Sequence, residues 1–385
     1  MVAVTGVRTF PYNYTMTRRI GDVHLPEGTD AGSDMAVMIE TDEGATGVAV
    51  GYGQGTAAIA QFAPLLAGED PRSVRGLWER MRSLAFKMGA AGPAKIAISA
   101  LDAALWDLRS KLNGVPLWKE LGAVSGSAAG YASGLDTPLD DDQLGDFYTR
   151  MAALGFNAGK LKVGLDQEAD LRRLRIMRDA LATSGKRPVL MIDSNEYWTP
   201  KQSIRRIAEI EQEFDLAWAE EPAGRRDATG LRTVSRAIRA AVATGENLDN
   251  SGDFANLIRA EAVDVVQVGA LTSGISGALQ VAEMAYANDL PVAMMNCPGR
   301  YMAHLAAALP HHLMMEVLDC GRDQLFTHQA RLQGGRIVLG DAPGSGIVFD
   351  ESVLESNRDD APSPRSLRSI YRRSAVSWVD EHRTT

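Results

Sequence analysis

A repeated alternation of short apolar segments with longer polar segments of helical spacing constrains the fold most strongly. It begins near residue 128, and polar stretches such as 167–182 and 200–213 separate the apolar runs. The apolar runs number eight: AGYASGL, GKLKVG, VLMIDSN, LAWAEEP, AAVATGE, AVDVVQVG, PVAMMN and LMMEVLD. Eight strand–helix units in succession are typical of a TIM-type barrel.

The segment before the barrel has a different pattern. Two apolar runs within 34–53 flank the turn Thr-Asp-Glu-Gly, which indicates a β-hairpin. Apolar residues then recur at helical spacing in 93–114, and Gly114 provides a stop signal. We therefore predict an N-terminal α+β domain over 1–127, the barrel over 128–345, and a C-terminal segment, 346–385, that returns to the first domain.

Charge and cysteine content narrow the class of protein. The formal net charge of −9 gives no reason to expect a nucleic-acid partner. Cys297 and Cys320 do not form a disulfide framework. A signal-peptide pattern is missing, and no apolar run approaches the ~18 residues that a membrane span needs. We expect a cytoplasmic protein without a membrane partner.

Polar side chains follow nearly every predicted barrel strand, where active sites of such barrels lie. Three carboxylates on neighbouring strands would repel one another unless a divalent cation joined them, and hard oxygen ligands suit Mg²⁺. The candidates are Lys160, Lys162, Asp193, Asn195, Glu220 or Glu221, Glu246, Asp264, Asn296 and Glu316.

Two of these candidates are lysines one residue apart. Because side chains alternate along a strand, Lys160 and Lys162 emerge on the same side. Adjacent ammonium groups repel each other, which lowers a lysine pKa toward neutrality and favours a role as a base.

With these residues in place, the chain resembles the enolase superfamily, and within it the mandelate racemase group of acid-sugar dehydratases and racemases. The resemblance rests on ALDAALWDLRSKLNGVPLWKELG and on the strand signatures KLK, DSN, EEP, GE and DVVQ. It implies a modified TIM barrel, (β/α)₇β, with an N-terminal α+β capping domain. It also implies Mg²⁺ held by Asp193, Glu220 and Glu246, with Glu221 as the alternative to Glu220.

The resemblance further implies removal of a proton next to a substrate carboxylate, giving an enolate. Lys162 is the expected base. Lys160 is expected to lower its pKa and to bind the substrate carboxylate. Glu316 stands where the racemases place a protonated carboxylic acid that donates a hydrogen bond to the substrate.

The chain departs from the racemase pattern on the opposite face. There the racemases use a histidine after strand seven, paired with an aspartate on strand six. Asp264 is present as a candidate for the aspartate, either catalytic or structural, but Asn296 replaces the histidine. A single base disfavours racemisation and is compatible with elimination. Tyr301, Arg300 or Lys162 itself would then assist the leaving hydroxyl.

These observations favour a Mg²⁺-dependent lyase that dehydrates a hydroxy acid or sugar acid to a 2-keto-3-deoxy acid. The alternatives are a single-lysine isomerase or cycloisomerase, and a non-catalytic carboxylate-binding barrel. The expected partners are a small carboxylate substrate and further copies of the chain in a homo-oligomer. Capping-domain loops near His24 and 51–55 are expected to determine specificity.

Overall fold

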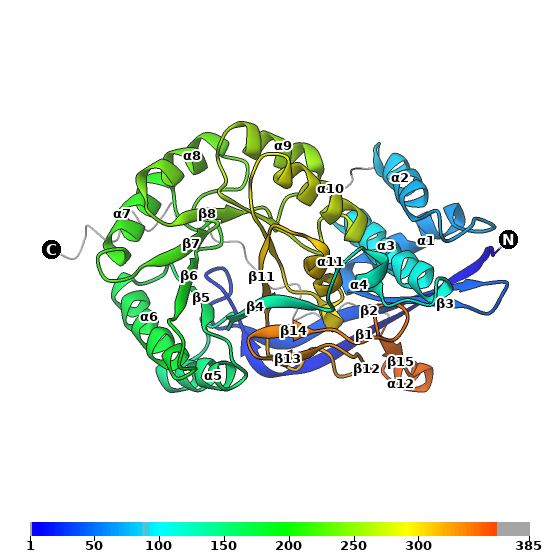
Figure 1. The fold of residues 1–385 in the computed structure, drawn as a ribbon, viewed down its shortest axis with the longest axis horizontal. Helices are drawn as coiled ribbons and strands as arrows, with labels where there is room; N and C mark the ends of the chain where they lie inside the picture. The colour runs from blue at the N-terminus through cyan, green and yellow to red at the C-terminus, as the bar shows by residue number, and fades with distance from the viewer. Residues whose placement is uncertain (1, 88, 90, 360–385) are drawn as a thin grey trace.

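The computed structural model describes residues 2–87, 89 and 91–359, which form a parallel barrel and an antiparallel sheet domain beside it (Figure 1). Residues 360–385, the end of the predicted C-terminal segment, lie outside the described residues. No helix in the described part of the chain is long and apolar enough to cross a membrane.

Eight parallel strands form the barrel, in chain order, and the pairing of Met315 with Gly130 closes it. All eight coincide with the predicted apolar runs, so the barrel prediction is confirmed. The strands are β4 (Ser127–Ser133), β5 (Ala158–Lys162), β6 (Val189–Asp193), β7 (Leu216–Glu220), β8 (Ala241–Thr244), β9 (Val265–Val268), β10 (Val292–Met294) and β11 (His312–Val317).

Seven helices connect these strands and surround the barrel (Figure 1). Some begin at capping boxes, in which Asp140 or Thr199 accepts a hydrogen bond from a backbone N–H that the helix leaves unpaired. The helices are α5 (Asp141–Ala153), α6 (Gln167–Ala182), α7 (Pro200–Ile210), α8 (Ala228–Ala237), α9 (Ser251–Arg259), α10 (Gly274–Tyr286) and α11 (Met302–Ala308).

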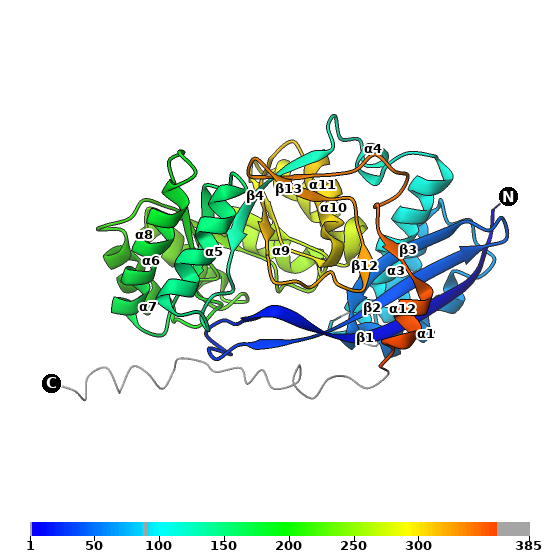
Figure 2. The ribbon, with the colours of Figure 1, turned by 90° about the horizontal axis from the view of Figure 1, so that it is seen from below.

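The N-terminal domain contains the sheet β1 (Val4–Ile20), β2 (Thr29–Thr41) and β3 (Thr46–Tyr52), in that order. The β2–β3 hairpin was predicted, whereas β1 was not. Figure 2 shows the β1–β2 hairpin extending along the barrel, where Gly21 bridges to Asp136. The helices of this domain are η1 (Gly53–Gly55), α1 (Thr56–Phe62), η2 (Ala63–Leu65), α2 (Val74–Ala85), α3 (Pro93–Leu112) and α4 (Leu117–Glu120).

Helix α3 joins the two domains through two buried carboxylates. Asp102 accepts hydrogen bonds from the backbone N–H and the hydroxyl of Ser276, at 2.9 and 2.6 Å, in the first turn of α10. Asp107 accepts from the backbone N–H of Val48, at 2.8 Å, and from that of Ser345, at 2.7 Å. Buried charges of this kind need partners, so the domains are fixed against each other.

After the barrel the chain forms short elements that extend toward the N-terminal domain. The β13–β14 hairpin, which was not predicted, adds to β4 at its start. Further along, residues 351–358 lie against β1, where Arg358 bridges to Tyr12. The elements are β12 (Phe326–Thr327), β13 (Arg331–Gln333), β14 (Arg336–Val338), β15 (Val348–Phe349) and α12 (Glu351–Ser356). A further short helix, η3 (Pro298–Arg300), lies within the barrel between β10 and α11.

Candidate active site

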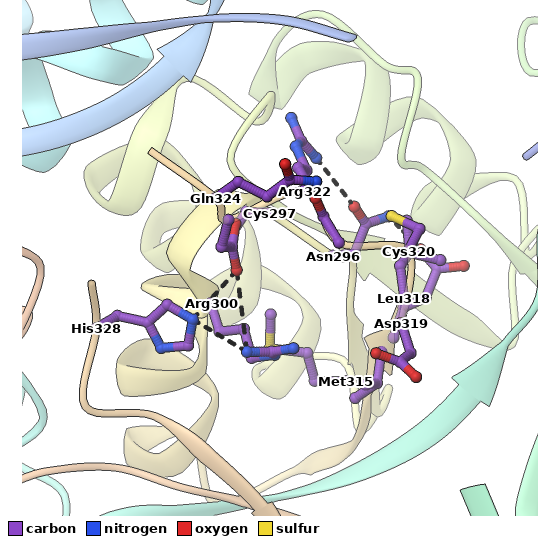
Figure 3. Close-up of a pocket in the computed structure, with 14 residues that line it drawn as sticks. Asn296, Cys297, Arg300, Met315, Leu318, Asp319, Cys320, Arg322, Gln324 and His328 are labelled. Atoms are coloured by element: carbon purple, nitrogen blue, oxygen red, sulfur yellow. Dashed lines mark hydrogen bonds and ion pairs between the residues drawn. The ribbon is translucent and has the colours of Figure 1, made fainter. Parts of the chain in front are cut away.

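The carboxyl ends of the barrel strands face the N-terminal domain, whose side chains contact them. His24 contacts the backbone oxygen of Asn195 at 2.7 Å, and Arg18 donates to the backbone oxygen of Gly134 at 2.5 Å. A cavity of about 260 Å³ opens beside the end of β11, lined in part by Asn296 and Glu316 (Figure 3). Two side chains of the N-terminal domain thus reach the mouth of the barrel.

Strand alternation determines which side chains reach this mouth. An apolar cluster fills the barrel interior and includes Ala158, Met191 and Trp218. Residues two positions further along each strand point the same way, one layer nearer the mouth. Those residues are Lys160, Asp193 and Glu220.

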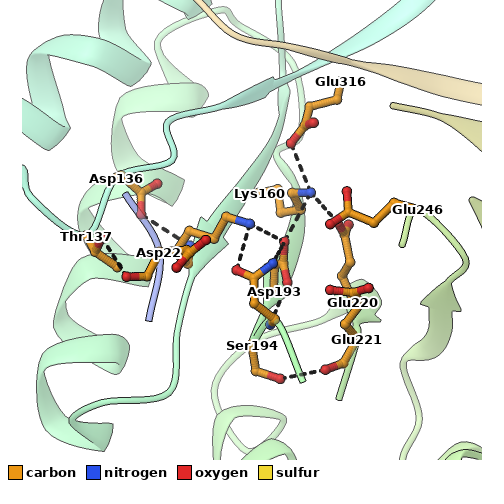
Figure 4. A network of polar contacts seen from close by, with 12 residues as sticks. Asp22, Asp136, Thr137, Lys160, Asp193, Ser194, Glu220, Glu221, Glu246 and Glu316 are labelled. Atoms are coloured by element: carbon orange, nitrogen blue, oxygen red, sulfur yellow. Dashed lines mark hydrogen bonds and ion pairs between the residues drawn. The ribbon is translucent and has the colours of Figure 1, made fainter. Parts of the chain in front are cut away.

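Lys160 lies at the centre of a buried network of charges (Figure 4). Its Nζ is 2.5 Å from Glu220 Oε1, 3.0 Å from Glu316 Oε1 and 3.4 Å from Asp193 Oδ2. Burial lowers the pKa of Lys160, but the surrounding carboxylates outweigh burial, and its pKa lies well above the usual value. Lys160 is held as a cation between three strands.

Lys162 emerges one layer further out, on the same side. Its Nζ donates to Asp193 Oδ2 and, at 2.9 Å, to Asn195 Oδ1. Burial and Lys160 both lower the pKa of Lys162, as expected, but Asp193 and other carboxylates reverse the net direction. The expectation of a pKa near neutrality is therefore not met in this arrangement.

Local backbone geometry places the acids that follow β6, β7 and β8. Asn195 and Glu221 both adopt the left-handed region, with φ of 44° and 42°, which turns the chain sharply after the strand. Gly245 precedes Glu246 with φ of 132°, and a Cβ there would lie 2.6 Å from the backbone oxygen of Gln267. A glycine is thus required at position 245, where the chain after β8 approaches β9.

Glu220 at the end of β7 and Glu246 after β8 keep raised pKa values although Lys160 opposes the rise in both. Burial, followed by the charge of Asp193, raises the pKa of Glu220 well above its usual value. Burial is also the largest cause for Glu246, whose pKa is raised to about 7. Glu221 has a different partner, since it accepts from Asn247 Nδ2 at 2.9 Å. Glu220, and not Glu221, therefore shares the network of Lys160.

The donor set suits a magnesium ion. Asp193, Glu220 and Glu246 supply hard oxygen ligands whose mutual repulsion a divalent cation removes. In the described part of the chain, no three histidine, cysteine, aspartate or glutamate side chains lie close enough together to hold a metal ion. Lys160 and Lys162 take up two of these carboxylates instead.

Glu316 is held as a carboxylate. Burial raises its pKa, but Lys160 and Lys162 outweigh burial, so the net direction is downward. Asn296 Nδ2 donates to Glu316 Oε2 at 2.5 Å, and Arg322 lies 3.5 Å from Asn296 Oδ1. This arrangement does not match the expected protonated donor.

Asp264 does not reach the mouth, which corrects its assignment as a catalytic candidate. It precedes β9, and its carboxylate accepts from the backbone N–H of Val242 at 2.7 Å and from Ser235 at 2.9 Å. These contacts lie at the amino end of the barrel. Gln267, two residues beyond the inward-facing Val265, is the β9 side chain that faces the mouth.

Tyr301 also lies away from the cavity. It is 3 % exposed at the start of α11, and burial raises its pKa well above the usual value. Its neighbour Arg300 does line the cavity. Sequence reasoning missed Arg322, which pairs with Asp34 through two contacts of 3.1 Å and lies over the Tyr52 ring. No local signal connects residues so far apart in the chain.

Comparison with known proteins identifies the chain's relatives. Residues 23–122 match the mandelate racemase/muconate lactonizing enzyme N-terminal domain, and residues 143–353 match the enolase C-terminal domain-like family. A 3,6-anhydro-alpha-L-galactonate cycloisomerase of Streptomyces coelicolor is 33% identical, over 82% of this chain and 89% of its own length. An L-talarate/galactarate dehydratase of Salmonella typhimurium is 35% identical, over 82% and 80% respectively.

The solved structures agree. A racemase from Streptomyces coelicolor with bound magnesium superimposes with a TM-score of 0.84 at 31% identity, covering 92% of this chain and all of the other. The chain is thus similar to these proteins over both the N-terminal domain and the barrel. The chain belongs to the mandelate racemase/muconate lactonizing enzyme family of the enolase superfamily.

Proposed function

We propose that this protein dehydrates a sugar acid to a 2-keto-3-deoxy acid, beginning with removal of the proton α to the carboxylate. The asymmetry of the mouth carries the proposal. Lys162 stands on one face, whereas β9 and β10 present Gln267, Gly269 and Asn296 on the other. None of these three residues ionises near neutral pH, so the proposal gives the role of base to Lys162.

In this proposal Asp193, Glu220 and Glu246 hold Mg²⁺, which supplies a Lewis acid for the substrate carboxylate. Burial and the neighbouring acids raise the pKa of both Glu220 and Glu246 despite Lys160. This supports the choice, because a divalent cation would relieve the repulsion among these carboxylates. Lys160 remains beside the site and adds a second positive charge for the substrate carboxylate.

The remaining steps use the chain's own groups. Because Asp193 raises the pKa of Lys162, Lys162 must first lose its own proton to solvent. As the neutral amine, its Nζ then takes the α-proton, and the electron pair of the C–H bond forms the enolate. The C3–O bond then breaks, and Lys162 returns its proton to the departing hydroxyl, which leaves as water. The resulting enol ketonises to the 2-keto-3-deoxy acid. Because one lysine serves both ends, the two groups leave from the same face.

Cycloisomerisation is the second candidate. The 33% identity to a cycloisomerase favours it, and the reaction also needs only one lysine. Racemisation is disfavoured, because inversion normally requires a base on each face of the substrate. The two candidates differ in their products, since only dehydration releases water.

The test is incubation of the pure protein with Mg²⁺ and a library of sugar acids in D₂O, with detection of 2-keto acids and of deuterium at the α-carbon. We expect a 2-keto-3-deoxy acid from at least one substrate. Conversion to an isomer of unchanged mass would support cycloisomerisation instead. Absence of both product and exchange across the library would contradict an enzymatic role at this site.

A further inference from the structure

The cavity beside β11 reaches into the segment that follows the strand. Its described lining residues all lie between positions 296 and 328, so none comes from the capping-domain loops expected to determine specificity. A volume of about 260 Å³ corresponds to roughly eight waters at ~30 Å³ each. The proposed chemistry involves only the first three carbons of the substrate, so a longer substrate needs such a space.

Each arginine that lines the cavity lies near an acidic side chain. Arg322 is held by Asp34, from the capping domain, through two contacts of 3.1 Å. Arg300 Nη1 lies 3.9 Å from Asp323 Oδ2, which also contacts His328 Nε2 at 3.2 Å (Figure 3).

The lining as a whole contains two arginines, Arg300 and Arg322, against three acids, Glu316, Asp319 and Asp323. Counting only arginines, aspartates and glutamates, two positive and three negative charges give a formal charge of −1. Arg322 is held by Asp34 and Arg300 lies near Asp323, so a second carboxylate would compete with acids that are already present. Such a group would instead meet a net negative surface.

Arg300 nevertheless has hydrogen-bonding capacity to spare. Both of its contacts use Nη1: His328 Nε2 at 3.2 Å and the longer contact to Asp323. Its Nε and Nη2 donate to no other described residue. A guanidinium offers five N–H donors, and hydroxyl oxygens accept from them without adding charge. The backbone of Arg300 is in the left-handed region, with φ of 53°, a conformation that tends to be kept where it orients a functional group.

We infer that this cavity binds the uncharged polyhydroxyl tail of a monocarboxylic sugar acid, with Arg300 donating hydrogen bonds to its hydroxyls, and that dicarboxylic sugar acids are rejected. The inference rests on the proposed function, which places the reacting carbons of the substrate beside Lys162. It names the class of substrate that the proposed reaction leaves open.

The first test compares matched aldonic and aldaric acids of the same configuration and chain length. The kcat/KM for the aldonate should exceed that for the aldarate at least tenfold, chiefly through KM. Asp323→Asn removes one negative charge while keeping a side chain that can accept from the Gly299 N–H, so the preference should fall at least threefold. Asp215→Asn, at an exposed ion pair before β7, is the matched control and should leave the preference unchanged.

The second test shortens the substrate. Arg300→Met should raise the KM of a six-carbon aldonate at least tenfold, yet change that of three-carbon 2,3-dihydroxypropanoate less than twofold. Arg300→Lys should recover part of the loss. Equal losses for both acids would mean that Arg300 supports the fold of the site and not the tail, which would overturn the inference.

Failure of the inference is separable from failure of the proposed function. Exchange of the α-proton with an equal or better kcat/KM for the aldarate would overturn the inference alone. If no acid exchanges its α-proton, the proposed function fails. Calorimetric titration of both acids into the Mg²⁺-loaded protein then decides the inference: tighter binding of the aldonate supports it, and equal or weaker binding overturns it.

Discussion

Replacement of Lys162 by alanine is the sharpest test of the chemistry. The side chain of Lys162 is 4 % exposed, and its Nζ is directed by Asp193 and by Asn195 Oδ1 at 2.9 Å. Water in the space left by alanine would lack both the basicity and the position of the amine. Lys160 cannot substitute, because Glu220 and Glu316 hold its Nζ at 2.5 and 3.0 Å. We therefore expect the full contribution of a general base to be lost.

That contribution is typically 10²–10⁴-fold, or about 3 to 5.5 kcal/mol of barrier. The assay is α-proton exchange into D₂O, followed by NMR, with product formation measured in parallel. Both rates should fall by the same factor, while Mg²⁺ affinity measured by calorimetry stays within a few-fold of the original. A loss smaller than about tenfold would refute Lys162 as the base.

The control is Lys186→Ala. Lys186 is exposed and donates to the backbone oxygen of Gly155 at 3.2 Å, before β6 begins. Its removal changes the net charge by the same amount without approaching the mouth. Exchange should therefore remain within twofold of the original rate. A comparable loss in this variant would point to a general effect of charge on the fold.

Three further outcomes are expected. Chelation of the metal should abolish turnover, and Glu246→Gln should weaken Mg²⁺ binding, as measured by calorimetry. The metal site would be contradicted if protein that elemental analysis shows to be metal-free kept full activity. Any α-proton exchange should be stereospecific, and rapid equilibration of α-epimers would require an unidentified second base. Burial raises the pKa of Asp102 to about 7, so its stabilising contribution is present below pH ~4 and is lost as pH rises through 7. The Tm should therefore fall between pH ~4 and 7, and Asp102→Asn should make this fall smaller. The same dependence of Tm on pH in both proteins would refute the role given to Asp102.

The barrel could be predicted because its signal is local and repeated. Each buried strand is a short apolar run, and the intervening helices are long enough to be distinguished from it. Strand β1 was missed for the opposite reason. Its 17 residues are mostly half-exposed and polar, and Pro11 interrupts the run. Only its long pairing with β2 makes it a strand, and pairing partners are not visible in a single segment.

The positions of the candidate site residues could be predicted where strand parity applied to a correctly placed strand. Lys160, Asp193 and Glu220 follow inward-facing residues at a spacing of two. The same reasoning failed for Asp264, because β9 begins at Val265 and the aspartate precedes it. The ionised state of Glu316 was also beyond prediction, since it depends on a 3.0 Å contact with Lys160 across the barrel.

The two carboxylates of α3 bear on the order in which the chain can fold. The ribosome adds Asp102 and Asp107 early. Ser276, which binds Asp102, comes 174 residues later, and Ser345, which binds Asp107, comes 238 residues later. Until Ser276 emerges from the ribosome, Asp102 would lack its two hydrogen-bond donors, whereas Asp107 keeps Val48 and Lys111 within the N-terminal domain. The domain is therefore expected to remain open during synthesis and to consolidate only when the barrel is nearly complete. Long-range closure of this kind slows folding and makes the two domains a single cooperative unit.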